Sequence, residues 1–190
     1  MLRSFDQSSH SYLGYVLRIE GVIDEKQREF LVGIGKAAQA KHGFCVGTVV
    51  SGQSEPVVDG RLEVVEFYKT SKLKVMEQPA EVSVKAPPWL GVPVDLETYQ
   101  QRGHRRLDVQ TYQSKCSSCV WGCKMAVEMI IDQWKPWQKK HRQETFCYGP
   151  KSCVFYQAGP TRKVPGRKGM VWEEEDWVDE EAVAHRSMDE

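Results

Sequence analysis

Two cysteine-rich stretches, KCSSCVWGC (Lys115–Cys123) and FCYGPKSC (Phe146–Cys153), decide how the rest of the chain is organised. Five of the six cysteines fall within them, at Cys116, Cys119, Cys123, Cys147 and Cys153. Cysteines that served only as small hydrophobic core residues would be scattered along the chain. Thiolates bind zinc, iron–sulfur clusters and copper(I). The concentration of cysteine therefore predicts a metal site.

The spacing of the cysteines favours a four-thiolate zinc site with a structural role. Two residues separate Cys116 from Cys119, a gap that lets both sulfurs reach one ion from a tight turn. Cys147 and Cys153 are the second predicted pair of ligands, and the residues between the pairs are predicted to form a helix that leaves the site and returns to it. Cys123 would then lie one helical turn after Cys119, beside the site.

The fifth cysteine keeps an iron–sulfur cluster, with a redox or catalytic role, open as the alternative. Cys116, Cys119 and Cys123 can supply three ligands to such a cluster, and Cys147 or Cys153 the fourth. Aromatic residues near the cysteines would shield the cluster from water: Trp121, Phe146, Tyr148, Phe155 and Tyr156. Whether Cys123 is a ligand separates the two interpretations.

The formal net charge of zero hides an uneven distribution of charged residues. Residues 135–170 contain many lysines and arginines but one acid, Glu144, whereas the chain from Val171 onward is strongly acidic. The basic segment predicts binding to nucleic acid, or to an acidic protein, beside the metal site. The residues expected to contact a nucleic-acid backbone are Arg162, Lys163, Arg167 and Lys168. An equally weighted alternative is that the acidic tail folds onto this segment and neutralises it.

The pattern of hydrophobic residues predicts an α+β fold that begins with a βαβ unit. Tyr12–Gly21 alternates like a strand, and Asp24 begins a capping-box pattern that is typical of a helix start. Phe44–Gly52 is predicted to be a second, buried strand, parallel to the first, with Cys45 as a core residue.

The pair Pro87-Pro88 marks the predicted boundary between two lobes. Residues 1–88 are predicted to form an N-terminal α/β lobe. Residues 89–190 are predicted to form a cysteine-ligated metal-binding lobe that carries the basic loop and the acidic C-terminal tail.

The stretch VVDGRLEVVEFYKTSK resembles the strand pair of the restriction-endonuclease-like nucleases over some sixteen residues. The resemblance implies that Asp59, Glu66 and Lys69 hold a metal ion. The family pattern, however, places an acid two positions before the lysine, where this chain has Phe67, and a strand would point Glu66 and Lys69 to opposite faces. We therefore assign no catalytic residue from the sequence, and leave enzyme activity and oligomeric state open.

No apolar run approaches the roughly 20 residues that a membrane-spanning helix needs. The polar N-terminus also lacks the apolar segment of a secretory signal. The sequence therefore predicts a cytoplasmic protein without a membrane partner, in which clustered cysteines stay reduced.

Overall fold

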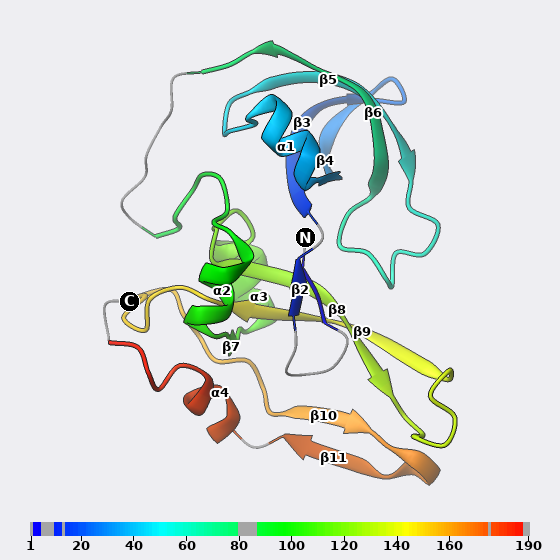
Figure 1. The fold of residues 1–190 in the computed structure, drawn as a ribbon, viewed down its shortest axis with the longest axis vertical. Helices are drawn as coiled ribbons and strands as arrows, with labels where there is room; N and C mark the ends of the chain where they lie inside the picture. Colours follow the sequence, from blue (N-terminus) through cyan, green and yellow to red (C-terminus); the bar gives the residue numbers. More distant parts are fainter. Residues whose placement is uncertain (1, 5–9, 13, 80–86, 175, 188–190) are drawn as a thin grey trace.

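The computed structural model describes residues 2–4, 10–12, 14–79, 87–174 and 176–187. Two β-sheets dominate the fold (Figure 1). The upper sheet has the strand order β3-β4-β6-β5, and the lower sheet has the order β2-β1-β8-β9-β7. A separate hairpin, β10–β11, and the short helix α4 (Trp177–Ala182) lie along the lower sheet.

The upper sheet is built on a long hairpin of β3 (Gly14–Ile23) and β4 (Lys26–Gly35). Asp24 and Glu25 join the two strands with φ angles of 48° and 63°, the left-handed conformation that a tight two-residue hairpin turn requires. Asp24 therefore begins no helix. The helix α1 (Lys36–His42) comes only after β4 and buries none of its residues.

The remaining upper strands are β5 (Val49–Pro56) and β6 (Phe67–Glu77), which pair with each other in an antiparallel and irregular register. β6 meets β4 in parallel at Val32 and Phe67. Phe30, Val32 and Phe67 form the buried core of this sheet, and side chains of β3 pack against them. Alternate residues of β4 thus face one side, which is the period of a strand and not of a helix.

The lower sheet is centred on the antiparallel pair β8 (Gly122–Ile130) and β9 (Lys139–Cys147). Their register runs without interruption from Gly122 opposite Cys147 to Ile130 opposite Lys139. The edges of the sheet are β1 (Leu2–Ser4) with β2 (His10–Tyr12) on one side and β7 (Arg105–Arg106) on the other.

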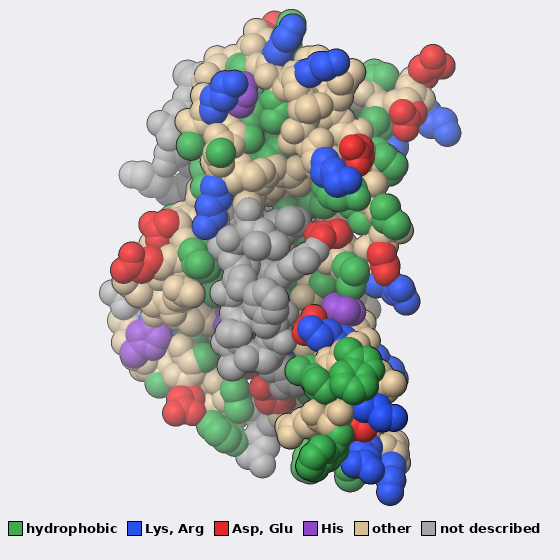
Figure 2. Space-filling model, turned by 45° about the vertical axis from the view of Figure 1, so that its right-hand side comes forward, with side chains coloured by type: hydrophobic (Ala, Val, Ile, Leu, Met, Phe, Trp, Pro, Cys, Tyr) green, Lys and Arg blue, Asp and Glu red, His purple; other side chains and the backbone are tan. Residues whose placement is uncertain are grey.

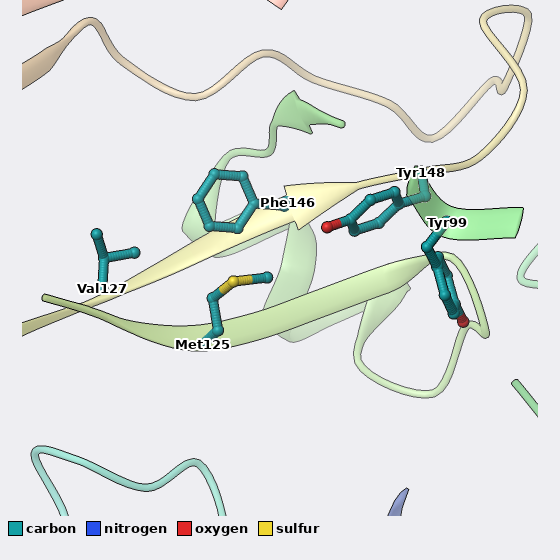
Figure 3. Close-up of a cluster of buried hydrophobic side chains, with 5 residues drawn as sticks. All are labelled: Tyr99, Met125, Val127, Phe146 and Tyr148. Atoms are coloured by element: carbon teal, nitrogen blue, oxygen red, sulfur yellow. The ribbon is translucent and has the colours of Figure 1, made fainter. Parts of the chain in front are cut away.

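The core of the lower lobe lies on one face of this pair (Figure 3). It consists of Tyr99, Met125, Val127, Phe146 and Tyr148, each at most 2% exposed. Met125 and Val127 are two residues apart on β8, so the pleat points both toward Phe146 of β9 (Figure 3). Tyr99 comes from helix α2 (Leu96–Arg102), which begins at the capping residue Asp95. Burial of each such side chain contributes about 1.5–3 kcal/mol to stability.

The chain is mixed α+β with several sheets, but the predicted architecture is wrong in both lobes. Asp24 lies in a hairpin turn, and the predicted strands 12–21 and 44–52 do not form a βαβ unit. The residues after Cys119 form β8 and not a helix. In the described part of the chain, no group of three or more His, Cys, Asp or Glu residues is arranged to hold a metal ion, so the structure shows no preassembled metal site among the described residues of the C-terminal lobe.

The division into residues 1–88 and 89–190 stays a prediction. The topology adds that β1 and β2, from the start of the chain, belong to the lower sheet, where Ser4 of β1 pairs with Val127 of β8. The chain thus starts in the lower lobe, forms the upper sheet and then returns.

His104, which precedes β7, makes the lower lobe sensitive to acid. Its ring packs edge-on against Phe146 at a centroid distance of 5.1 Å, and burial lowers its pKa to about 4 from the ordinary 6.5. Between these two pH values the unfolded chain binds a proton at His104 that the folded chain does not bind, so the free energy of unfolding falls as the pH falls. We expect His104→Leu to reduce the loss of stability between pH 6.5 and pH 4, measured by urea unfolding at both pH values. Identical losses in the variant and the parent protein would contradict this assignment.

Candidate functional site: the cysteine cluster

A pair of tight turns before β8 positions the first two cysteines. Asp108 accepts a hydrogen bond from the backbone N–H of Thr111 and starts the short helix α3 (Val109–Thr111), which continues as a wider turn to Cys116. The N–H of Cys119 then donates to the carbonyl of Cys116 at 3.0 Å, and the N–H of Gly122 donates to the carbonyl of Cys119 at 3.1 Å. The chain therefore folds tightly around Cys116 and Cys119 before it enters the sheet.

Gly122 brings this turn against the second cysteine stretch. A Cβ atom at Gly122 would lie 2.4 Å from the carbonyl oxygen of Cys116, so only glycine fits there. Gly122 is also the residue opposite Cys147 in the β8–β9 register. As a result Cys116 and Cys147 are buried in one cluster with Leu107, and Cys119 packs against it.

The second stretch forms its own tight turn. The N–H of Gly149 donates to the Cys147 sulfur at 3.3 Å, and the N–H of Cys153 donates to the carbonyl of Pro150 at 3.2 Å. Cys153 lies near enough to contribute to the raised pKa values of Cys116, Cys119 and Cys147. Four predicted ligands are thus brought into one region, and we refer to Cys116, Cys119, Cys147 and Cys153 as the cysteine cluster.

The surroundings of the cluster hold three of its thiols neutral. The pKa of Cys116 is raised to about 12, mainly by burial and to a smaller extent by the charges of the neighbouring thiols. Burial also raises the pKa of Cys119 and of Cys147. At neutral pH these three groups are therefore protonated in the absence of metal.

Backbone groups and one cation act in the opposite direction. Hydrogen bonds from the backbone at Trp121 oppose the raised pKa of Cys119, and the Gly149 N–H and the Arg105 guanidinium oppose that of Cys147. Such donors stabilise a thiolate once its proton has left. The site therefore already contains partners for thiolate sulfur, although all of its cysteines are free thiols.

Cys123 faces away from the cluster. It pairs with Phe146 in the register, one position from the pair of Gly122 and Cys147, and adjacent positions of a strand point to opposite faces. Cys123 accordingly packs against the core around Met125 and Phe146, where burial raises its pKa to about 12. Cys123 thus lies on the opposite face of the strand pair from Cys147, although the charges of Cys147 and Cys119 still contribute to its raised pKa.

The predicted nucleic-acid residues are largely engaged within the protein. The side chain of Arg162 is 4% exposed and pairs with Glu144 at 2.6 Å and with Glu174 at 3.0 Å. Lys163 pairs with Glu173 at 3.0 Å. These contacts exist because β10 (Arg162–Pro165) pairs with β11 (Val171–Glu174), which places the start of the acidic tail beside the basic segment.

The three residues of the nuclease-like stretch do not converge on one site. Asp59 pairs with Arg61, Glu66 with Arg28, and Lys69 with Glu55. Each thus has an opposite charge as its neighbour, and none is recorded in a shared group of metal-binding side chains among the described residues.

A cavity of about 650 Å³ between the two lobes was not anticipated from the sequence. Apolar side chains from both lobes line it, and Cys119 and Cys123 form part of its wall. Its walls come from segments as far apart as Tyr15 and Lys124, so no local sequence pattern could have revealed it.

No protein-family model, curated protein sequence or solved structure matches this chain. Among the described residues, no helix is both long and apolar enough to cross a lipid bilayer.

The burial of Arg162 predicts a structural role for this residue. Replacing it with leucine removes the cation that pairs with Glu174 and removes the guanidinium from the Phe146 ring, 5.4 Å away. We expect Arg162→Leu to lower the free energy of unfolding by about 3 kcal/mol, because breaking a buried ion pair is costly. The matched control is Lys163→Ala, whose exposed pair contributes at most about 1 kcal/mol. Equal effects of both substitutions in urea unfolding would contradict this role.

Proposed function

We propose that this protein is a binding module in which the cysteine cluster takes up one structural zinc ion. The observation that carries the proposal is the convergence of two tight turns that hold the cysteines. The Gly149 N–H donates to the Cys147 sulfur in one turn, and backbone hydrogen bonds oppose the raised pKa of Cys119 in the other. A zinc ion held there would take the four sulfurs at about 2.3 Å in tetrahedral geometry. The ion would link the turn before β8 to the loop after β9.

The position of Cys123 favours zinc over the iron–sulfur alternative that uses Cys123 as a ligand. A cluster held by Cys116, Cys119 and Cys123 would have to draw ligands from both faces of the sheet, because Cys123 packs against the core around Met125. Zinc needs only the four cysteines that lie together. Zinc is therefore the cofactor that we propose.

Metal analysis of point variants tests this assignment. We expect the protein to be purified colourless with about one zinc per chain, and Cys147→Ser to lose the metal and to unfold at a lower temperature. Cys123→Ser is the matched control, since it removes a neighbouring thiol outside the cluster and should leave the zinc content unchanged.

Three outcomes would contradict the zinc proposal. The first is a brown protein that contains iron. The second is loss of metal from Cys123→Ser. The third is a protein whose unfolding temperature is unaffected by a strong chelator and by added zinc.

The raised pKa values predict that zinc uptake releases protons. Because Cys116, with a pKa of about 12, is protonated at neutral pH, as are Cys119 and Cys147, zinc must displace at least these three protons. The apparent affinity for zinc should therefore fall as the pH falls. We expect the logarithm of the apparent Kd to change by at least about three per pH unit between pH 6 and pH 7.5.

Competition with a coloured chelator over this pH range measures the slope. The control is Cys45→Ser, because Cys45 lies in the upper lobe, where it hydrogen-bonds with Thr48. The slope of this variant should equal that of the parent protein. A slope near one would mean that the thiols are not displaced together and would contradict a multi-thiolate site.

A further inference from the structure

The outer end of the β8–β9 hairpin displays two tryptophans to solvent. Trp134 is 81% exposed and Trp137 is 71% exposed, although tryptophan is on average one of the more buried residue types. The turn that carries them is ordered: the N–H of Trp134 donates to the Asp132 carboxylate at 3.0 Å, and the N–H groups of Lys135 and Gln138 close successive turns. The indoles are thus held outward by a defined turn.

The end of the β10–β11 hairpin lies beside this turn and carries a third exposed indole. Trp172 is 64% exposed, and its ring edge rests on Gly166, where an added Cβ would lie 2.8 Å from Nε1. Arg167 approaches the Asp132 carboxylate at 3.9 Å, which connects the two hairpin ends. Both ends lie at the lower right in Figure 1, and green and blue side chains gather there in Figure 2.

Cations surround these indoles. Lys135 stands between Trp134 and Trp137 in the sequence, Lys140 follows in β9, and Lys168 lies at the end of the second hairpin. All three are exposed, and within the described part of the chain they are recorded with no carboxylate partner, unlike Lys139 and Lys163, which pair with Glu128 and Glu173. The acidic tail therefore neutralises the basic segment near Arg162 but leaves the cations of the hairpin ends available.

We infer that the two hairpin ends form a binding surface for single-stranded nucleic acid. We refer to Trp134, Trp137, Trp172, Lys135, Lys140 and Lys168 as the hairpin-end surface. Unpaired bases stack on exposed indoles, and lysines beside them neutralise the phosphates. A duplex hides its base faces and offers the indoles nothing to stack on.

The polar residues of the turn distinguish this partner from a lipid bilayer. Asp132, Gln133 and Gln138 flank the two tryptophans. Inserting both indoles into a membrane would carry a carboxylate and two amides toward the hydrocarbon, which is costly. The exposed amides of Gln133 and Gln138 can hydrogen-bond with base edges, since amides are common partners of bases.

This surface is independent of the proposed zinc site. The register places Gly122 and Cys147 at one end of the β8–β9 pair, and the turn 131–138 follows the other end. Eight residues of strand separate them, a length of about 26 Å at 3.3 Å per residue. Zinc content and nucleic-acid binding can therefore fail separately.

Fluorescence anisotropy with the full-length, zinc-supplemented chain tests the inference. The probes are labelled 12-nucleotide oligo(U) and oligo(dT), with a duplex of equal length as a comparison. We expect both single strands to bind and to quench tryptophan fluorescence, and the duplex to bind at least about tenfold more weakly. Trp134→Ala and Trp137→Ala should each weaken binding by about tenfold, as loss of one stacked base does. Binding of only the RNA or only the DNA strand would narrow the partner to that class and support the inference.

Matched variants separate the surface from general charge and folding. The logarithm of the association constant falls as the logarithm of the salt concentration rises. Lys135→Ala should make this slope shallower by about 0.7, as loss of one phosphate contact to a single strand does. Lys74→Ala, an exposed cation of β6, and Trp177→Ala, an exposed indole of α4, should leave binding unchanged. Zinc content and unfolding temperature are measured for each variant, so that a misfolded variant is recognised.

Three results would overturn the inference. One is the absence of single-strand binding at low salt by the folded protein. Another is binding that Trp134→Ala and Trp137→Ala leave intact. The third is that the protein binds vesicles of 30% phosphatidylserine in phosphatidylcholine, loses this binding in Trp134→Ala, and binds neither oligonucleotide. That result would assign the surface to membranes.

Discussion

The antiparallel register between β8 and β9 determines where the chemically important side chains of the lower lobe lie. Gly122 opposite Cys147 brings the turn of Cys116 and Cys119 against the second cysteine stretch. The next pair, Cys123 and Phe146, turns the remaining cysteine toward the opposite face. A shift of one residue in this register would exchange the two faces and would separate Cys147 from Cys116. The same register ends at Ile130 and Lys139, so the intervening turn projects beyond the sheet with its exposed tryptophans.

The uneven distribution of charge along the chain is largely resolved by the β10–β11 hairpin. Pairing of Arg162 with Glu174 and of Lys163 with Glu173 in register brings the basic segment and the acidic tail together. Farther along, Arg106 pairs with Asp179 of α4 at 2.6 Å, which fixes this helix to the lobe. Lys135, Lys140 and Lys168, which pair with no carboxylate in the described part of the chain, lie at the hairpin ends. The place expected for a nucleic-acid partner therefore moves from beside the cysteines to the far end of the same strands.

Two expected helices failed for a common physical reason. Short apolar runs satisfy helical and strand periodicities equally well, and tertiary pairing decides between them. Ala126, Val127 and Ile130 fit a helical stripe, but Met125 and Val127 also alternate, and β9 provides a partner for that alternation. Asp24 fits a helix cap, but with Glu25 it also adopts a two-residue hairpin turn once β3 and β4 pair along their whole length. In each case a short window of sequence could not show which strand would pair with the segment.

The sequence by itself identified the cysteines that gather, because clustering and spacing are properties of the chain that no fold is needed to see. It also identified the opposed basic and acidic segments, and left open whether they would meet. Only the tertiary structure decided which face of the sheet each cysteine occupies, since that depends on register between residues more than twenty positions apart. The cavity between the lobes and the adjoining of two hairpin ends likewise arise from segments distant in sequence, and so they required the folded chain.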